Sequence, residues 1–155
     1  LQWEKKTTTI GSGKNYADPH DVDNTYQWCL DANTDGCDNA GNPSDGTAFT
    51  DFLAKLNTPP CFADHCDWRL PSEDGQNSPF TGAKELESIQ PTICAGFPDP
   101  CIDSIFGPTA IDTYWSVTTR TLGPDQAWGV DFESGFVFNV FKGNAVFVRA
   151  VRAVP

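Results

Sequence analysis

One stretch of this sequence, DANTDGCDNAG, combines residue types and a spacing that suit calcium chemistry. Side-chain oxygens recur at its first, third and fifth places, a glycine follows at the sixth, and the seventh residue offers its backbone carbonyl, as in calcium-binding loops. The next carboxylate, or a distant one at Asp21 or Asp23, completes the coordination shell. The stretch therefore predicts a weak extracellular calcium site, with candidate ligands Asp31, Asn33, Asp35, Cys37 and Asp38.

The same stretch also suits an ordinary polar turn. Its twelfth place is Asn42, so the bidentate glutamate of an EF-hand is missing. Asp and Asn side chains build turns without a metal, because they bond to the backbone two residues further on. A disulfide between Cys29 and Cys37 holds the ends of the loop together in either case. Two interpretations therefore stay open: a disulfide-closed turn, and the same turn with bound calcium.

The six cysteines fall into three close pairs along the chain, namely Cys29–Cys37, Cys61–Cys66 and Cys94–Cys101. Their proximity and the turn-rich segments between them favour three local disulfides, each of which stabilises the fold by about 2–3 kcal/mol. The alternative is a zinc site with Cys61, His65 and Cys66 as ligands, but a fourth ligand of the usual spacing is missing. Disulfides indicate an oxidising location, which is the bacterial cell surface, the periplasm or, for a secreted protein, the medium.

The sequence offers little for catalysis. Its two histidines, His20 and His65, lie in predicted loops, and it contains no nucleophile elbow, HExxH zinc motif or glycine-rich phosphate loop. The Glu-Pro-Asn, Gln-Pro-Asp and Trp-Asn-Asp motifs of calcium-dependent lectins are absent as well. We therefore expect a protein that is not an enzyme, and we do not expect a primary sugar site of the lectin type.

The charge balance excludes several partners. With 21 acidic and 10 basic residues the net charge is −11, which repels nucleic acid, anionic membranes and polyanions such as heparin. We interpret the C-terminal arginines as ion-paired to carboxylates; the alternative is a local basic patch of Arg120, Lys142, Arg149 and Arg152. No apolar run is long enough for a membrane span. The absence of methionine predicts a chain processed or excised from a longer secreted polypeptide.

The pattern of elements predicts a single α+β domain over residues 1–155. A strand opens the chain at 1–10, residues 11–46 form loops, and two short helices follow at 47–57 and 81–91, the first capped by Asp45 or Thr47. The segments 113–119, 126–132, 136–141 and 145–154 are rich in β-branched and aromatic residues and predict a C-terminal antiparallel sheet. The expected core includes Trp68, Leu70, Trp115, Trp128, Phe138 and Phe147, whereas Arg69 points away from it.

An ordered set of motifs carries a resemblance to a known family. The motifs are LQWEKK, CDWRLPS, KELESI, YWSVT, AWGVDFESG and FVRAVR. Together they resemble the Lcl C-terminal domain family, which includes the C-terminal domain of the Legionella collagen-like adhesin. The chain departs from the family in a longer spacer after CDWRLPS and in a long acidic region between Lys6 and Thr47.

The resemblance implies a C-type-lectin-like fold, related to that of formylglycine-generating enzymes, in which the first and last strands pair and long loops bind ligands. The adhesin of the family binds sulfated polysaccharide and forms a trimer. By analogy we expect a non-catalytic extracellular binding or adhesion module, with a glycan or surface polymer as ligand and a homo-oligomeric state. The alternative is a structural subunit of a bacterial surface assembly or extracellular filament, whose partners are copies of itself.

Overall fold

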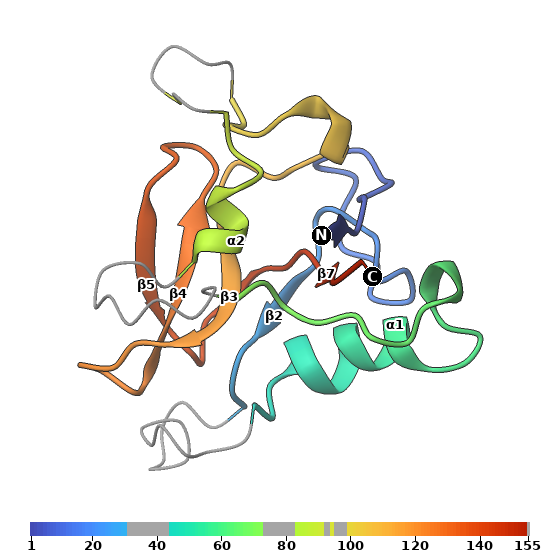
Figure 1. The fold of residues 1–155 in the computed structure, drawn as a ribbon, viewed down its shortest axis with the longest axis horizontal. Coiled ribbons are helices and arrows are strands. Elements are labelled where there is room, and N and C mark those ends of the chain that lie inside the picture. Colours follow the sequence, from blue (N-terminus) through green and yellow to red (C-terminus); the bar gives the residue numbers. More distant parts are fainter. Residues whose placement is uncertain (31–43, 73–82, 92–93, 95–98, 155) are drawn as a thin grey trace.

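The computed structural model describes residues 1–30, 44–72, 83–91, 94 and 99–154. They form an α+β fold in which short helices lie beside a five-stranded sheet, together with a separate two-stranded sheet (Figure 1). The fold class expected from the sequence is thus confirmed.

The larger sheet has the strand order β2-β6-β3-β4-β5. Its neighbours pair antiparallel except for β3 and β6, which are parallel. The aromatic and β-branched segments predicted the central strands well, because such side chains suit a pleated surface with packing on it. The strands are β2 (Thr25–Gln27), β3 (Thr113–Thr119), β4 (Gln126–Asp131), β5 (Val137–Phe141) and β6 (Ala145–Phe147).

The two ends of the chain meet in the smaller sheet, where β1 (Gln2–Trp3) pairs antiparallel with β7 (Val151–Arg152). The pairing of first and last strands, which the family resemblance implied, is therefore confirmed. The predicted opening strand is much shorter than expected, and the predicted strand at 145–154 is split between the two sheets. The split lies at Arg149, whose fully buried side chain is bonded to oxygens outside either sheet.

The five-stranded sheet has a hydrophobic core on each face, because successive residues of a strand point to opposite sides. On β3, Trp115 enters one cluster and Tyr114 the other, and both side chains are fully buried. The first cluster also holds Phe52, Leu56, Trp68, Leu70 and Val148. The second holds Val22, Leu86, Ile89, Ile102, Val130 and Phe132. The sheet is therefore packed on both of its faces.

Two helical segments supply much of that packing. The π-helix η1 (Ala48–Leu53) runs into α1 (Ala54–Asn57), as expected for 47–57, but neither Asp45 nor Thr47 caps it with its side chain. Both side chains instead accept bonds from other backbone N–H groups, Asp45 from Leu30 and Thr47 from Gln27. Helix α2 (Lys84–Glu87) is shorter than the predicted 81–91. Two 3-10 turns, η2 (Phe62–Asp64) and η3 (Ser104–Phe106), complete the helical elements.

The core predictions hold with one exception. Trp68, Leu70 and Trp115 are buried, and Trp128 and Phe147 are half-buried against the second cluster. The prediction for Phe138 is wrong, because its side chain is 46% exposed. It lies on β5, the last strand of the sheet, where a neighbouring strand covers one side only.

Two of the three predicted disulfides, Cys61–Cys66 and Cys94–Cys101, are present. The first rules out the alternative zinc site at Cys61, His65 and Cys66, because a disulfide sulfur is no longer a thiolate ligand. Cys29 is buried, but its predicted partner Cys37 lies outside the described residues, so the third pairing stays a prediction.

Candidate functional site

Two of the motifs that carry the family resemblance are joined by a structural ion pair. The Arg69 guanidinium donates to both carboxylate oxygens of Glu85, at 2.7 and 2.8 Å, and the Ser72 backbone N–H donates to the same group at 2.6 Å. Burial raises the pKa of Glu85, but the bonds from Arg69 and Ser72 outweigh it and hold the pKa below its ordinary value. This ion pair therefore links CDWRLPS to KELESI in the folded chain.

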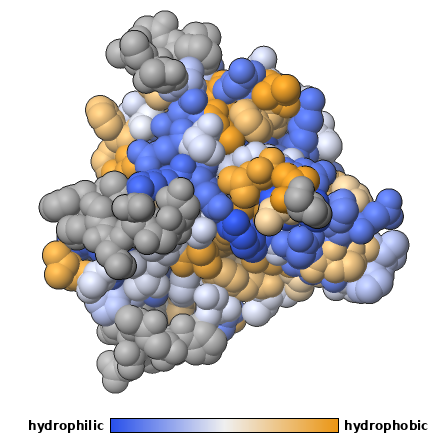
Figure 2. Space-filling model, viewed as in Figure 1, coloured by the Kyte–Doolittle hydropathy of each residue, from blue (hydrophilic) through white to orange (hydrophobic). Residues whose placement is uncertain are grey.

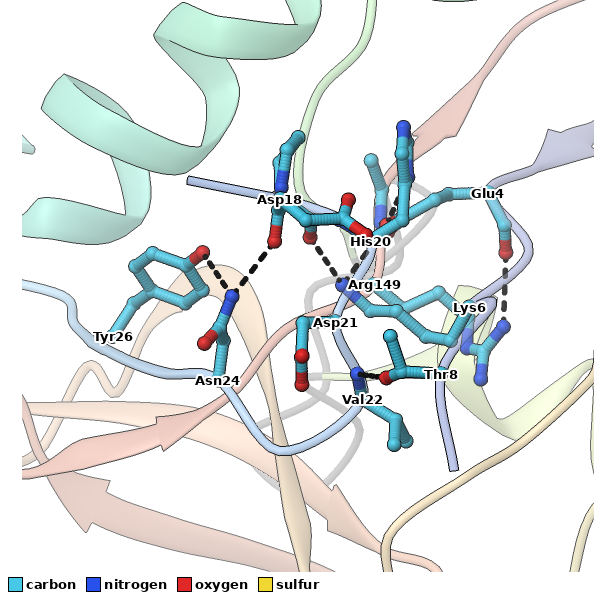
Figure 3. Close-up of polar contacts among 12 residues, drawn as sticks. Glu4, Lys6, Thr8, Asp18, His20, Asp21, Val22, Asn24, Tyr26 and Arg149 are labelled. Carbon is cyan, nitrogen blue, oxygen red and sulfur yellow. Dashed lines mark hydrogen bonds and ion pairs between the residues drawn. The ribbon is translucent and has the colours of Figure 1, made fainter. Parts of the chain in front are cut away.

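A second polar cluster lies in the interior, around the fully buried carboxylate of Glu4 (Figure 3). One oxygen lies 2.9 Å from the Lys6 ammonium and 2.9 Å from Nδ1 of His20, and the other accepts from the Ala150 backbone N–H at 2.9 Å. Burial raises the pKa of Glu4, but the charge of Lys6 and these hydrogen bonds together lower it by more, so the pKa lies below its ordinary value. This cluster fastens the N-terminal segment to the last strand.

The C-terminal cations form no surface patch. Arg149 is fully buried and donates to the carbonyls of Glu4, Phe106 and Pro108 and to the Thr109 hydroxyl, so the predicted carboxylate partner is wrong for this residue. Arg152 does pair with a carboxylate, that of Asp67, at 2.8 Å. Lys142 is buried with its ammonium 4.0 Å from the Trp28 ring centre. Three of the four candidate cations are thus committed to the fold.

A cavity lies at the β2 edge of the sheet and is called here the Tyr16 pocket. It has a volume of about 300 Å³ and is lined by Tyr16, Thr25, Tyr26, Gln27, Thr47, Asp51 and Ala145. Tyr16 is 42% exposed as a residue, and its ring meets the buried ring of Tyr26 edge to face, with 5.6 Å between the centroids. The pocket therefore offers an aromatic face beside amide, hydroxyl and carboxylate groups.

Several contacts hold this pocket in shape. The Tyr16 hydroxyl donates to the Thr25 carbonyl at 3.2 Å, and the Asp51 carboxylate pairs with Lys55 at 2.7 Å. The Lys55 ammonium also donates to the Tyr16 carbonyl, which ties helix α1 to the loop before β2. Burial raises the pKa of Tyr26 far above its usual range, so its phenol stays neutral. The lining is thus a fixed set of neutral donors and acceptors with one carboxylate.

The loop that presents Tyr16 is anchored from below by Asn24, whose side chain is 1% exposed. Its amide nitrogen donates to the carbonyls of Asn15 and Asp18, both at 2.9 Å, and Figure 3 shows it beside Tyr26. A second clamp closes the loop further upstream, where the Asp23 carboxylate accepts from the backbone N–H groups of Gly11 and Gly13. The loop is therefore held by one buried side chain, Asn24, and by the partly exposed carboxylate of Asp23.

A larger cavity, called here the Ile10 pocket, has a volume of about 660 Å³. Its walls are mostly apolar, with Ile10, Pro100, Ile102 and Pro108 beside Asp99, Asp103, Ser104, Gly107 and Thr109. The Asp103 carboxylate already accepts from the Ile105 backbone N–H at 2.9 Å. On the face shown in Figure 2, hydrophobic residues also gather in separate patches between hydrophilic ones. The lining of this cavity suits an apolar or cationic group, and none of its described lining residues is aromatic.

The chain that has these features, namely the paired terminal strands, the Arg69–Glu85 ion pair and the two disulfides, also matches a known protein family. The family described as the Lcl C-terminal domain matches residues 1–152. The chain belongs to this family. No curated protein and no solved structure shows significant similarity to it. Within the described part of this Lcl C-terminal domain, no helix is both long enough and apolar enough to cross a membrane.

The predicted calcium ligands of this Lcl C-terminal domain, which are Asp31, Asn33, Asp35, Cys37 and Asp38, lie outside the described residues. The two more distant candidate ligands, Asp21 and Asp23, lie within the described residues. Asp21 is buried and accepts from the Asp23 backbone N–H at 2.8 Å, and Asp23 holds the turn at Gly11 and Gly13. Within the described ranges, no group of three or more His, Cys, Asp or Glu side chains suits a metal ion.

Sequence reasoning missed the Tyr16 pocket of this Lcl C-terminal domain. Its lining comes from a loop, from β2, from η1 and from β6, which are up to 129 positions apart between Tyr16 and Ala145. No local motif joins them, because only the packing of η1 beside β2 brings Asp51 near Tyr26. The one available signal was the pair of tyrosines around a polar loop, and aromatic residues there also suit a core.

Proposed function

We propose that this domain is a non-catalytic extracellular adhesion module that binds a neutral carbohydrate in the Tyr16 pocket. Membership of a family that contains a surface adhesin supports the adhesion role. The two disulfides suit a secreted or cell-surface location, since such bonds persist in oxidising surroundings. The observation that carries the carbohydrate proposal is the exposed Tyr16 ring beside a fixed rim of polar groups.

A pyranose ring presents an apolar face of C–H groups and a rim of hydroxyls. An exposed aromatic ring packs on the apolar face of the sugar, and amide, hydroxyl and carboxylate groups form hydrogen bonds with its hydroxyls. Ligand pockets commonly combine apolar walls with a few polar groups in this way. In this pocket Tyr16 supplies the ring, while Gln27, Thr47 and Asp51 surround it. A cavity of about 300 Å³ has room for one or two sugar units.

The charge of the site favours a neutral sugar over a sulfated one. Asp51 is a carboxylate in the lining, and the whole chain carries a net charge of −11, so a sulfate group meets repulsion at both ranges. The nearby ammonium groups are already engaged, Lys14 with the Thr25 hydroxyl at 2.7 Å and Lys55 with Asp51. With one ring and a few hydrogen bonds, we expect a single-site Kd of roughly 1 mM, about −4 kcal/mol.

The test is a titration of the isotope-labelled domain with neutral oligosaccharides chosen from a glycan array, followed by NMR. Binding should disappear in Tyr16→Ala, weaken in Asp51→Asn and survive in Tyr16→Phe, which keeps the ring. The matched control is Ile10→Ala, because Ile10 is a comparably exposed residue that lines the other cavity. Loss of binding in Ile10→Ala with full binding in Tyr16→Ala would place the ligand in the Ile10 pocket and refute the site proposed.

The second candidate function is a structural subunit of a surface assembly. It is favoured by one observation, the uncharged and exposed strand β5 at the end of the sheet, which offers one contact between copies of the domain. A surface assembly larger than a dimer needs a second contact elsewhere on the chain. Light scattering and electron microscopy of the purified domain separate the two roles. Long polymers without glycan retention support the structural role, whereas retention on a glycan surface by a small dispersed particle supports adhesion.

A further inference from the structure

Strand β5 ends the five-stranded sheet, and within the described part of the chain no strand pairs with its outer side (Figure 1). Such an edge carries unused backbone N–H and C=O groups, which are a template for another strand. Most natural edges are guarded by charged residues, prolines or bulges. The run from Phe136 to Phe141 contains none of these residue types, and its pairing with β4 is regular over five residues.

The hydrogen-bond phase of β5 shows which of its backbone groups point outward. The Asp131 N–H donates to the Phe136 carbonyl at 3.0 Å, and the Lys142 N–H donates to the Asp125 carbonyl at 2.9 Å. In an antiparallel pair, hydrogen-bonded and non-hydrogen-bonded positions alternate. Counting by twos from Phe136, residues 138 and 140 face β4. The N–H and C=O groups of Val137, Asn139 and Phe141 therefore face away from the sheet.

The side chains at this edge are apolar and accessible. Phe138 is 46% exposed, Phe141 is 55% exposed, and Phe136 just before the strand is 67% exposed. Phe138 lies on the sheet face of Trp115, and Phe141 lies on the opposite face with Trp128. Both faces of the edge thus offer an aromatic ring to whatever pairs with it.

The opposite edge of the same sheet is protected. On β2 the Thr25 carbonyl accepts from the Tyr16 hydroxyl at 3.2 Å, and the Gln27 N–H donates to the Thr47 hydroxyl at 2.9 Å. Side chains from a loop and from the start of η1 therefore occupy the groups that a further strand needs. Among the described strands of the larger sheet, β5 is the edge that remains open.

We propose that β5 pairs antiparallel with β5 of a second copy of this chain, with Asn139 on the two-fold axis. In that register the Asn139 residues exchange two hydrogen bonds, and Val137 of each copy lies opposite Phe141 of the other. At all three positions the backbone N–H and C=O groups face away from β4, so they are free to bond with the facing strand in this register. Phe138 then meets Val140 across the axis on one face, and Val137 meets Phe141 on the other. Aromatic and β-branched side chains form favourable cross-strand pairs.

The strand itself favours a second copy as the occupant, because the outward backbone groups and the exposed apolar side chains of β5 match when the strand pairs with itself. Two chains of net charge −11 repel one another over most of their surfaces, so close contact between copies requires a region without like charges. The segment 136–141 is such a region. Because the opposite edge is occupied by side chains, the contact closes on itself as a two-fold dimer and does not propagate into a filament.

The interface is small. Phe138 and Phe141 each have about half of a side chain to bury, roughly 100 Å² apiece on the scale of a phenyl group. Together with the strand backbone this stays well below the area of a standard stable interface. We therefore expect a reversible dimer that is populated at high concentration and dissociates on dilution.

Sedimentation velocity from micromolar to millimolar protein tests the proposal. The wild type should move from monomer to dimer, and Asn139→Pro should stay monomeric with an unchanged circular dichroism spectrum, since the lost N–H faces outward. Phe138→Lys should act similarly through charge. The matched control is Leu122→Lys, an 81% exposed apolar residue outside β5, which should dimerise as the wild type does.

Crosslinking provides a second readout that does not depend on affinity. In the proposed register, Asn139→Cys places two sulfurs across a hydrogen-bonded pair, at a Cα separation of about 5.5 Å that a disulfide spans. Mild oxidation should therefore give a covalent dimer, whereas Ile105→Cys, at an exposed position of η3, should not. The proposal is overturned if the wild type stays monomeric at all concentrations or forms open polymers. It is equally overturned if Asn139→Pro dimerises normally, or if only an unrelated extended peptide pairs with the edge.

Discussion

The buried ion pair between Glu4 and Lys6 makes a sharp prediction about stability. Both side chains are almost fully excluded from solvent, and their charged atoms lie 2.9 Å apart. Replacement of Lys6 by methionine keeps the length and the apolar contacts of the side chain, which lies over the Phe52 ring. It removes the charge, so the Glu4 carboxylate stays buried with only His20 and the Ala150 N–H as partners.

The expected loss is large because a buried charge without its partner is destabilising by about 3–5 kcal/mol. A domain of this length has a free energy of unfolding of roughly 5–15 kcal/mol, so the change takes away a substantial fraction. At about 2–4 °C per kcal/mol for a chain of this size, the melting temperature should fall by roughly 6–20 °C. The Glu4→Gln and Lys6→Met double variant should lose less than Lys6→Met alone, because the unpaired charge is gone.

Thermal melts followed by circular dichroism at pH 7 measure these differences. The matched control is Lys55→Met, which breaks a pair with Asp51 of similar length, 2.7 Å, but with both side chains more than a third exposed. Exposed pairs contribute about 0–1 kcal/mol, so this control should shift the melting temperature only slightly. If Lys6→Met melts within a few degrees of the wild type, or if both lysine variants behave alike, the argument from burial is wrong.

Three further predictions concern pH, metal and polyanions. The pKa values of Glu4 and Glu85 are lowered in the folded state, so the stabilisation from these carboxylates is complete above the ordinary pKa of 4.5 and is lost as the pH falls through their folded pKa values. The melting temperature should therefore drop below pH 4.5, and it should drop less steeply in Glu85→Gln. Calorimetry with millimolar calcium should give heat for the wild type and none for the Asp31→Ala and Asp35→Ala double variant; identical traces would leave only a polar turn. Heparin should bind no tighter than micromolar at physiological salt, because the net charge is −11 and Lys142 and Arg149 are buried; submicromolar binding would contradict this.

Local signals in the sequence predicted the elements that depend on local physics. The strands β3, β4 and β5 follow runs of aromatic and β-branched residues, and the short sequence separations of Cys61–Cys66 and Cys94–Cys101 favoured their pairing. The helix at 47–57 follows from apolar residues at helical spacing, and Phe52 and Leu56 are buried as that spacing requires.

Features that depend on distant parts of the chain were not predictable in the same way. Phe138 alternates like a core residue, but the order of strands leaves it at an edge. Arg149 was expected to pair with a carboxylate, yet the carbonyls of Glu4, Phe106 and Pro108 surround it once the chain is folded. The capping role expected of Thr47 went instead to holding the N–H of Gln27 on β2. In each case the partner is set by tertiary packing.

The proposed carbohydrate site and the proposed dimer contact lie on different edge strands of one sheet, since the Tyr16 pocket borders β2 and the pairing strand is β5. If pairing through β5 leaves both Tyr16 pockets open, the dimer is bivalent. On a dense glycan surface, the second contact raises apparent affinity by about 10²–10⁴ when the geometry allows both sites to engage. Asn139→Pro should dissociate faster than the wild type from a dense surface and at the same rate from a sparse one. If Asn139→Pro and the wild type dissociate at equal rates at both densities while Tyr16→Ala still fails to bind, the dimer is refuted and the carbohydrate site is supported. If Tyr16→Ala binds as the wild type does, the carbohydrate site is refuted, and sedimentation alone tests the dimer.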